Sequence, residues 1–230
     1  LSIASIVATL IAQQVAIGST ESLPLASRID NALVTYVNYL RQMFWPVDLA
    51  VLYPWEMTRL GISNTILSLV ILFGISAVIF VLRRRRYLVT GWLWYLIMLG
   101  PVIGIVQVGN QARADRYTYL PQIGLYLLLT WTVLEVAASW RYRRAILASL
   151  SSIILTALVF SAHVQASFWK DSESLWSHAL ASTTDNIVAE GNLGKACYDK
   201  GKTREAMHYF ENSLRIAPNQ APIHSCLGVF

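Results

Sequence analysis

Apolar residues in this chain form long uninterrupted blocks. Residues 60–82 and 88–108 carry no charged side chain, 145–163 carry no Asp, Glu, Lys or Arg, and 117–138 carry only Glu135. A helix needs about 20 residues to cross the roughly 30 Å of hydrocarbon in a bilayer, so each block is long enough. Inside lipid, only helices and closed barrels provide hydrogen-bond partners for all their backbone groups. These blocks lack the alternation of apolar and polar residues that is typical of barrel strands. The pattern therefore predicts four transmembrane helices.

A fifth candidate span covers residues 1–18, which include Gln13 and Gln14. The sequence opens inside this apolar run on Leu rather than Met, so we expect it to be a fragment of a longer protein. The alternative interpretation is a cleaved signal peptide. It is disfavoured because the run has no basic region before it and Ile17-Gly18-Ser19 is a poor cleavage sequence.

Composition agrees with a membrane bundle. Hydrophobic residues make up 55% of the 230 residues and charged residues 13%, against about 45–50% and about 25% in soluble globular proteins. We therefore predict an all-α fold with a polytopic transmembrane helix bundle over residues 1–166.

The arginines predict how the helices are oriented. Arg83–Arg86 follow the second span, and Arg141, Arg143 and Arg144 follow the fourth. Short loops rich in Lys and Arg stay in the cytoplasm, so residues 19–59, the loop at 109–116 and the chain after His163 should lie outside it. A run of four arginines also suits a nucleic-acid patch, but its place beside an apolar span favours the topological role, and no nucleic-acid partner is expected.

The outer segment contains an amphipathic helix at about 29–44. Its apolar positions recur three or four residues apart, and they are Ile29, Leu33, Val37, Leu40 and Phe44. Polar residues occupy the opposite face, and they are Asn31, Thr35, Asn38 and Gln42. We expect this helix to lie in the membrane interface plane. Pro46 and Pro54 bar a continuous helix after it, which predicts an irregular, aromatic-rich elbow.

A repeat is visible near the C-terminus. Leu193-Gly194 recurs as Leu227-Gly228, and this spacing equals the tetratricopeptide period of about 34 residues. The residues that match the repeat signature are Leu193, Gly194, Ala206, Phe210 and Pro218. Cys197 stands where the pattern asks for an aromatic residue, and Tyr198 falls one place late.

This spacing predicts an α-solenoid of tetratricopeptide repeats over residues 167–230. One full repeat should cover about 187–220, after a preceding helix at about 169–182 and before the first helix of a further repeat. Cys197 and Cys226 show no metal-site spacing and suit small core positions of such repeats. His178, His208 and His224 occur singly on helices. We expect neither a metal nor a cofactor.

Three charged residues, Arg113, Asp115 and Arg116, fill the short gap between two apolar blocks. Arginine is unusual in an outer loop, and its planar guanidinium is a preferred partner of phosphate. Asp115 would orient Arg116 or act on a sugar hydroxyl, while Tyr117 and Tyr119 offer stacking surfaces and hydroxyls. These residues suit a lipid-linked phosphate. The plain alternative is a solvated turn with an Asp115–Arg salt bridge.

Three segments carry a resemblance to a known family. They are A-D-R-Y-T-Y-L-P-Q-I-G-L at 114–125, preceded by G-P-V-I-G-I-V-Q-V-G, then F-W-P-V-D-L-A-V-L-Y-P-W at 44–55 and F-W-K-D-S-E-S-L-W-S-H-A-L at 168–180. Together they resemble bacterial multispan membrane proteins with C-terminal tetratricopeptide repeats. Those proteins are similar to the transmembrane-and-tetratricopeptide O-mannosyltransferases of the GT-C glycosyltransferase superfamily. The likeness covers most of residues 40–225.

The resemblance implies the C-terminal part of a GT-C-like membrane domain. It implies transfer of a sugar from a polyprenyl-phosphate donor to a protein acceptor on the extracytoplasmic side of a bacterial inner membrane, with the repeats binding the acceptor. Arg116 matches an arginine at the phosphate end of the donor site, with Arg113 assisting, and Asp115 matches the acid before it.

In GT-C enzymes the catalytic acid usually lies in the first outer loop, which this chain does not contain. The catalytic residue is therefore unknown, although Asp48 and Glu56 are outer acids, and the chain alone should be inactive.

Two other function classes fit parts of the sequence. A non-catalytic membrane-anchored tetratricopeptide scaffold for protein–protein interaction would also need spans and repeats. A transporter would need ionisable residues at mid-span, but the spans are almost free of charge.

Overall fold

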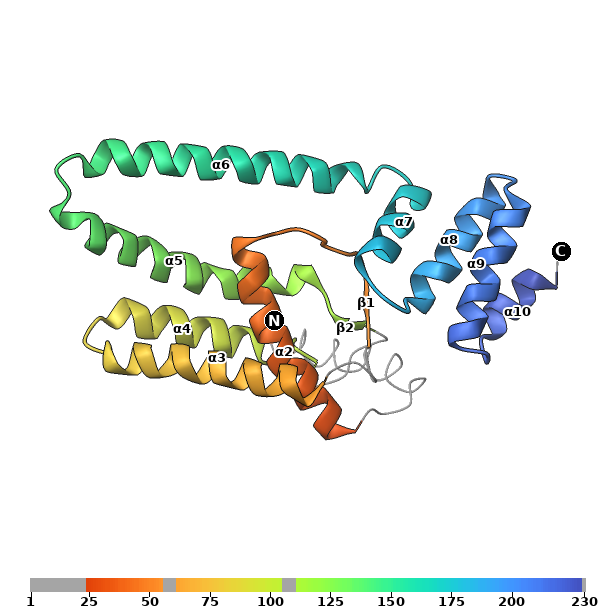
Figure 1. Cartoon of the computed structure of the whole chain (residues 1–230), viewed down its shortest axis with the longest axis horizontal. Helices are drawn as coiled ribbons and strands as arrows, with labels where there is room; N and C mark the ends of the chain where they lie inside the picture. The colour runs from red at the N-terminus through yellow and green to blue at the C-terminus, as the bar shows by residue number, and fades with distance from the viewer. Residues whose placement is uncertain (1–23, 56–60, 105–110, 229–230) are drawn as a thin grey trace, which may run out of the picture. The chain divides into compact units, whose positions relative to one another are not determined.

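The computed structural model describes residues 24–55, 61–104 and 111–228, and these are mostly helical (Figure 1). The chain divides into two compact units. The first consists of Leu1–Trp45 with Trp55–Ala138, and the second of Pro46–Pro54 with Ser139–Phe230. The candidate span at residues 1–18 lies outside the described residues.

The described residues of the first unit form three long helices, one shorter helix and a short extended segment. In chain order its elements are α2 (Leu25–Phe44), α3 (Ile62–Val81), α4 (Arg86–Leu99), β2 (Gln111–Arg113), the 3₁₀ turn η1 (Asp115–Thr118), α5 (Tyr119–Val136) and the 3₁₀ turn η2, which ends at Ser139 (Ala137–Ser139). The core contains Tyr39, Trp92, Tyr95, Leu99 and Ile103.

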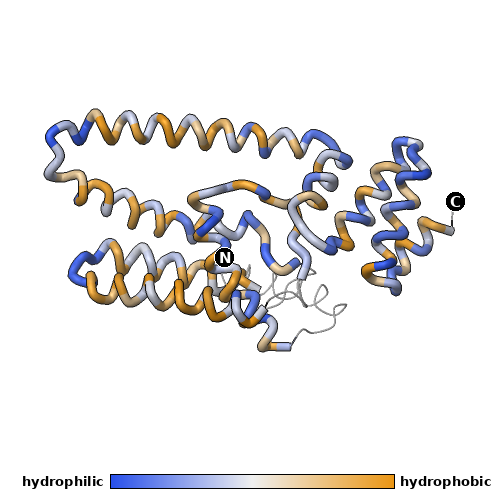
Figure 2. Tube along the Cα trace, viewed as in Figure 1, coloured by the Kyte–Doolittle hydropathy of each residue, from blue (hydrophilic) through white to orange (hydrophobic). Residues whose placement is uncertain are grey.

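Three helical stretches of the described chain are long and apolar enough to cross a membrane. They are Ile62–Val81, Asp115–Ser139 and Arg143–Ser167. Figure 2 shows orange apolar positions running along them. Many of their large apolar side chains are exposed, among them Phe73, Val81, Val159 and Phe160. Water would disfavour such surfaces, whereas lipid matches them, so the protein is a membrane protein.

The predicted helix over 88–108 is wrong in its length. Helix α4 begins at Arg86 and ends at Leu99, and its 14 residues rise about 21 Å, less than the hydrocarbon thickness. Pro101 has no amide hydrogen to donate to the preceding turn, and its ring crowds that turn, so the helix stops before it. Gly104 then has φ +93°, a conformation that side chains disfavour. Apolar composition alone did not reveal this end.

Helices α4 and α5 pack with their backbones unusually close. A Cβ built on Gly91 would lie 2.5 Å from the Gly124 carbonyl oxygen, and one on Gly124 would lie 2.5 Å from that of Gly91. Small residues allow this approach between membrane helices, where packing replaces the hydrophobic effect. The Trp94 indole also donates to the Leu120 carbonyl at 2.8 Å.

The opposite end of this helix pair is held by polar contacts. Arg85 forms an ion pair with Glu135, and the Tyr87 hydroxyl donates to the same carboxylate at 2.6 Å. The arginine-rich turn between α3 and α4 therefore lies at the end where α5 finishes. Because α5 rises about 27 Å over its 18 residues, Arg116 at its beginning is one helix length away from that turn.

Helix α2 is amphipathic, and part of its polar face is turned inward. Asn31, Thr35 and Tyr39 are buried, whereas Ile29 and Phe44 are 45% and 67% exposed. The stripe of polar residues at spacing four thus packs against the rest of the unit. The apolar residues near the helix ends are exposed, and the placement of this helix in the membrane interface stays a prediction.

The second unit is built from helices that return on one another. Its elements are β1 (Tyr53–Pro54), α6 (Arg143–Ser167), α7 (Ser172–Ser182), α8 (Ile187–Asp199), α9 (Thr203–Ile216) and α10 (Ala221–Leu227). Helices α7, α8 and α9 each contact the next helix in the chain. Asp171 and Asn186 cap the starts of α7 and α8 through their side chains.

Helices α8 and α9 form a close hairpin. Gly201, at φ +75°, lies in the turn, and a Cβ on Gly194 would lie 2.7 Å from the Phe210 ring. Cys197 is buried and Tyr198 is 43% exposed, so the cysteine occupies the inner position. The starts of α8 and α10, at Ile187 and Ala221, are offset along the chain by the same interval as the two Leu-Gly pairs.

Pro46–Pro54 is distant in sequence from the rest of the second unit, and its backbone carbonyls bind that rest of the unit. We call this segment the strap. The side-chain contacts to strap carbonyls are Ser161 to Pro46 (3.3 Å), Gln165 to Leu49 (2.9 Å), His178 to Leu49 (3.1 Å) and Asn186 to Leu52 (3.1 Å). The predicted elbow is thus irregular, and side chains from α6, α7 and the start of α8 position it.

The His178 ring is fixed between two partners. It stacks on Phe168, with centroids 3.7 Å apart and planes 4° from parallel, while Nε2 contacts the Leu49 carbonyl. This histidine joins α7 to the strap and to the residue that follows α6.

Replacing Gly91 by alanine should destabilise the first unit. The new methyl group would overlap the Gly124 carbonyl, and overpacking of this kind costs about 1–3 kcal/mol. Thermal unfolding of the protein in detergent would measure the loss. The control is Gly74→Ala on α3, where the added Cβ meets no described atom within 4 Å, so its midpoint should stay equal or rise slightly. Equal losses in both variants would contradict close packing at Gly91.

The start of α7 is joined to the α8–α9 turn by charge. Lys200 Nζ and Lys202 Nζ lie 2.7 Å and 2.6 Å from the two carboxylate oxygens of Glu173. Their hydrogen bonds lower the pKa of Glu173 from 4.5 to about 2. A lowered folded pKa adds stability above about pH 4.5, and this stability is lost as the pH falls through about 2.

We therefore expect Glu173→Gln to lose less stability on acidification than the unmodified protein. The measurement is the unfolding midpoint followed by circular dichroism between about pH 4.5 and about pH 2. Glu211→Gln, an exposed carboxylate on α9, is the control and should follow the unmodified protein. Identical acid profiles for all three would show that the lysine contacts do not depress the Glu173 pKa.

Candidate functional site

The charged turn lies where an extended segment becomes a helix. Arg113 ends β2, Asp115 and Arg116 begin η1, Tyr117 lies within η1, and Tyr119 is the first residue of α5. All five predicted donor-site residues therefore lie on one continuous segment, residues 113–119, which we call the charged turn. The arginines come from different elements, one extended and one 3₁₀ helical.

Local contacts shape the turn. The Tyr117 hydroxyl accepts from Gln111 Nε2 at 2.9 Å, and the Thr118 hydroxyl donates to the Asp115 carbonyl at 2.7 Å. Arg116 is exposed, with its guanidinium 5.1 Å from the centroid of the Tyr117 ring. Tyr117 itself packs partly against the core of the unit, which leaves the Arg116 guanidinium presented at the surface.

Arg113 and Tyr119 occupy different surroundings. Arg113 is half-buried, whereas Tyr119 is highly exposed at the start of α5. Pro121 is buried in the first turn of that helix, where the absence of its amide hydrogen costs nothing. An anion beside Arg116 would also lie near the positive end of the α5 dipole.

Two residues of α2, which sequence reasoning did not single out for the site, hold this turn. Asn31 Nδ2 donates to the Ala112 carbonyl at 3.1 Å. The Tyr39 hydroxyl donates to the Ala114 carbonyl at 2.8 Å and accepts from the Ala114 amide at 3.1 Å. Asn31 belongs to the polar face that the sequence predicted, whereas Tyr39 was not among its residues.

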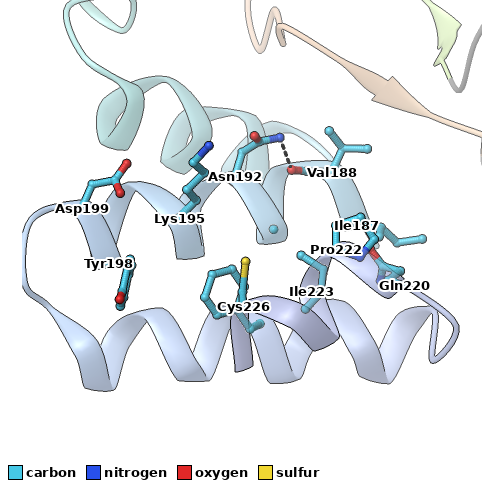
Figure 3. A pocket seen from close by; sticks show the side chains of 12 residues that line it. Ile187, Val188, Asn192, Lys195, Tyr198, Asp199, Gln220, Pro222, Ile223 and Cys226 are labelled. Carbon is cyan, nitrogen blue, oxygen red and sulfur yellow. Dashed lines mark hydrogen bonds between the residues drawn. The ribbon is translucent and has the colours of Figure 1, made fainter. Parts of the chain in front are cut away.

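A hollow lies on the face shared by α8 and α10. It has a volume of about 450 Å³, and its lining is mainly apolar. Val188 and Ile223 lie toward one end, and the charged side chains of Lys195 and Asp199 lie toward the other (Figure 3). The Asn192 side chain donates to the Val188 carbonyl at 2.7 Å, which fixes its orientation along the rim.

One cluster of potential metal ligands occurs in the described chain, formed by Glu173, Cys197 and Glu205. Lys200 and Lys202 already bind the Glu173 carboxylate. Burial, together with the two nearby carboxylates, raises the pKa of the Cys197 thiol, which disfavours the thiolate that a metal needs. The arrangement is better suited to an ion-paired helix junction than to a metal centre.

Known proteins with similar sequences are protein O-mannosyl-transferases. A stretch of 111 residues is 32% identical to protein O-mannosyl-transferase Tmtc2 of Drosophila melanogaster and covers 48% of this chain. Protein O-mannosyl-transferase F38B6.6 of Caenorhabditis elegans is 24% identical over 72% of the chain. Protein O-mannosyl-transferase TMTC4 of Homo sapiens is 25% identical over 56% of the chain.

The similarity is distant and partial. The chain spans 12%, 22% and 17% of the lengths of these three relatives. No protein-family profile matches the chain, and no solved structure matches it. The similarity indicates a distant relationship to protein O-mannosyl-transferases.

Proposed function

We propose that the protein transfers a sugar from a polyprenyl-phosphate donor to a protein acceptor on the extracytoplasmic side of the membrane. One observation supports this proposal most directly. Arg113 and Arg116 lie at one end of the α4–α5 pair, and the arginine-rich turn between α3 and α4 lies at the other end. Positively charged short loops favour the cytoplasm, so the opposite end is assigned to the outside. The names of the relatives suggest mannose as the first sugar to try.

In this proposal Arg116 binds the donor phosphate. A guanidinium donates two parallel hydrogen bonds to a phosphate and remains charged at any working pH. Arg113 adds positive charge from the preceding strand, and Asp115 orients the arginines or binds a sugar hydroxyl. The exposed ring of Tyr119 gives the sugar or lipid a flat surface beside them.

The proposed reaction is a displacement at the anomeric carbon. A hydroxyl oxygen of the acceptor forms a bond to that carbon, and the bond from the carbon to the phosphate oxygen breaks. The hydroxyl proton passes to a carboxylate, and the electron pair of the broken bond leaves with the phosphate. Arg116 stabilises the charge that grows on the leaving phosphate. We assign the carboxylate to none of the described residues.

The helices α7–α10 are proposed to be part of a tetratricopeptide solenoid that binds the acceptor. Three features support the repeat: the offset between the starts of α8 and α10, the Gly194–Phe210 contact and the turn at Gly201. The hollow between α8 and α10 is large enough for several side chains of an extended peptide. A bacterial inner membrane and the GT-C superfamily are part of the same proposal.

Arg116→Ala should abolish transfer while membrane insertion stays intact. Arg116→Lys should retain part of the activity, because it keeps the charge but loses the paired hydrogen bonds. The assay uses the native protein that carries this sequence, with polyprenyl-phosphate mannose and a protein acceptor. Arg141→Ala, in the predicted cytoplasmic loop, is the matched control and should keep full activity. Full activity of Arg116→Ala would remove the phosphate role.

Val188→Asp should weaken acceptor binding. It places a carboxylate in the apolar hollow, so the KM for a protein acceptor should rise about tenfold while the KM for the donor stays unchanged. Met207→Asp, on the exposed side of α9, makes the same chemical change outside the hollow and should leave both constants unchanged. An unaltered acceptor KM in Val188→Asp would separate the hollow from acceptor binding.

A further inference from the structure

The backbone on both sides of Arg113 is fixed by helix α2. Asn31 holds the carbonyl of Ala112, and Tyr39 holds both the carbonyl and the amide of Ala114. Three hydrogen bonds thus act on the two residues that flank Arg113. Since Asp115 and Arg116 follow directly, their starting point is fixed as well.

The two side chains are themselves firmly placed. Tyr39 is 0% exposed and lies in the core with Tyr95 and Leu99. Asn31 is buried, and a Cβ added to Gly104 would lie 3.4 Å from its Nδ2 and 3.3 Å from the Ala112 carbonyl. The amide and the carbonyl are therefore enclosed together, which restricts the rotamers open to Asn31.

Helix α2 is anchored to α4 independently of the turn. The Tyr36 hydroxyl donates to the Leu96 carbonyl at 2.8 Å, and the Tyr95 hydroxyl donates to the Tyr36 carbonyl at 2.6 Å. The rings of Tyr36 and Tyr95 also meet edge to face, with centroids 5.8 Å apart. These contacts join α2 to α4 and involve none of residues 112–114.

We propose that Asn31 and Tyr39 are positioning residues for the donor phosphate, acting through the backbone of residues 112–114. They contact neither donor nor acceptor; they set where the Arg113 and Arg116 guanidinium groups lie. A displacement of about 1 Å at a reacting centre can lower a rate about 100-fold, so the loss of one of these bonds should reach the chemistry. This inference rests on the proposed function of the turn.

The test compares two tyrosine-to-phenylalanine variants of the native protein. Tyr39→Phe removes the hydroxyl that binds Ala114 and keeps the ring in the core. Tyr95→Phe removes an equally buried hydroxyl that binds α2 to α4 and leaves the turn untouched. If positioning matters, kcat with polyprenyl-phosphate mannose falls about 10- to 100-fold in Tyr39→Phe and less than about threefold in Tyr95→Phe, while the two unfolding midpoints fall by similar amounts.

Two readouts do not depend on transfer. The Ala114 amide donates to the Tyr39 hydroxyl, so its hydrogen exchange should accelerate in Tyr39→Phe and remain slow in Tyr95→Phe. Binding of polyprenyl phosphate, the donor without its sugar, should weaken severalfold in Tyr39→Phe only. Asn31→Ala should also weaken polyprenyl-phosphate binding, because it releases the Ala112 carbonyl.

The outcomes separate this inference from the proposed function. Equal losses of kcat in Tyr39→Phe and Tyr95→Phe, or unchanged exchange at Ala114, would overturn the positioning role even if Arg116→Ala abolishes transfer. Full transfer and unchanged polyprenyl-phosphate binding in Arg116→Ala would overturn the phosphate role of the turn. Faster exchange at Ala114 in Tyr39→Phe would then still show that Tyr39 holds the segment, but the functional part of the inference would fall with the phosphate role.

Discussion

The candidate donor site depends on how the backbone carbonyl and amide groups outside helices find hydrogen-bond partners beside a membrane. Carbonyl and amide groups outside a helix need partners where water is scarce. Residues 112–114 find them in Asn31 and Tyr39, two buried side chains of a neighbouring helix. These two side chains hold the backbone on both sides of Arg113, and Asp115 and Arg116 follow directly in the chain.

The long apolar helices were predictable because their signal is local and strong. The apolar blocks at 60–82, 117–138 and 145–163 predicted helices within a few residues of the bounds of α3, α5 and α6. The end of α4 was not predicted, because the apolar block at 88–108 continues past Pro101. The helix ends before this proline, which has no amide hydrogen to donate. The inward turn of part of the α2 polar face was also not predicted. Beside lipid, periodicity identifies two faces of a helix without saying which one meets the protein.

The sequence predicted the charged residues of the candidate site but not the two residues of α2 that hold them. Arg113, Asp115 and Arg116 are noticed because charges stand out between apolar blocks, and they remain together in the structure because they are neighbours in the chain. Asn31 and Tyr39 act from 81 and 75 residues away. A single sequence carries no record of such pairings, since both residues suit an ordinary amphipathic helix. The strap shows the same limit: its prolines predicted irregular backbone but not the four side chains that bind it.

The strap also constrains how the protein can be made. Its Leu49 carbonyl meets His178, which is synthesised 129 residues later. At about 5–20 residues per second the ribosome needs about 6–26 s to cover that interval. The carbonyls of Pro46, Leu49 and Leu52 wait for partners that are made 115 to 134 residues later, while several apolar helices enter the bilayer. Closure of the strap is therefore a late step of biogenesis.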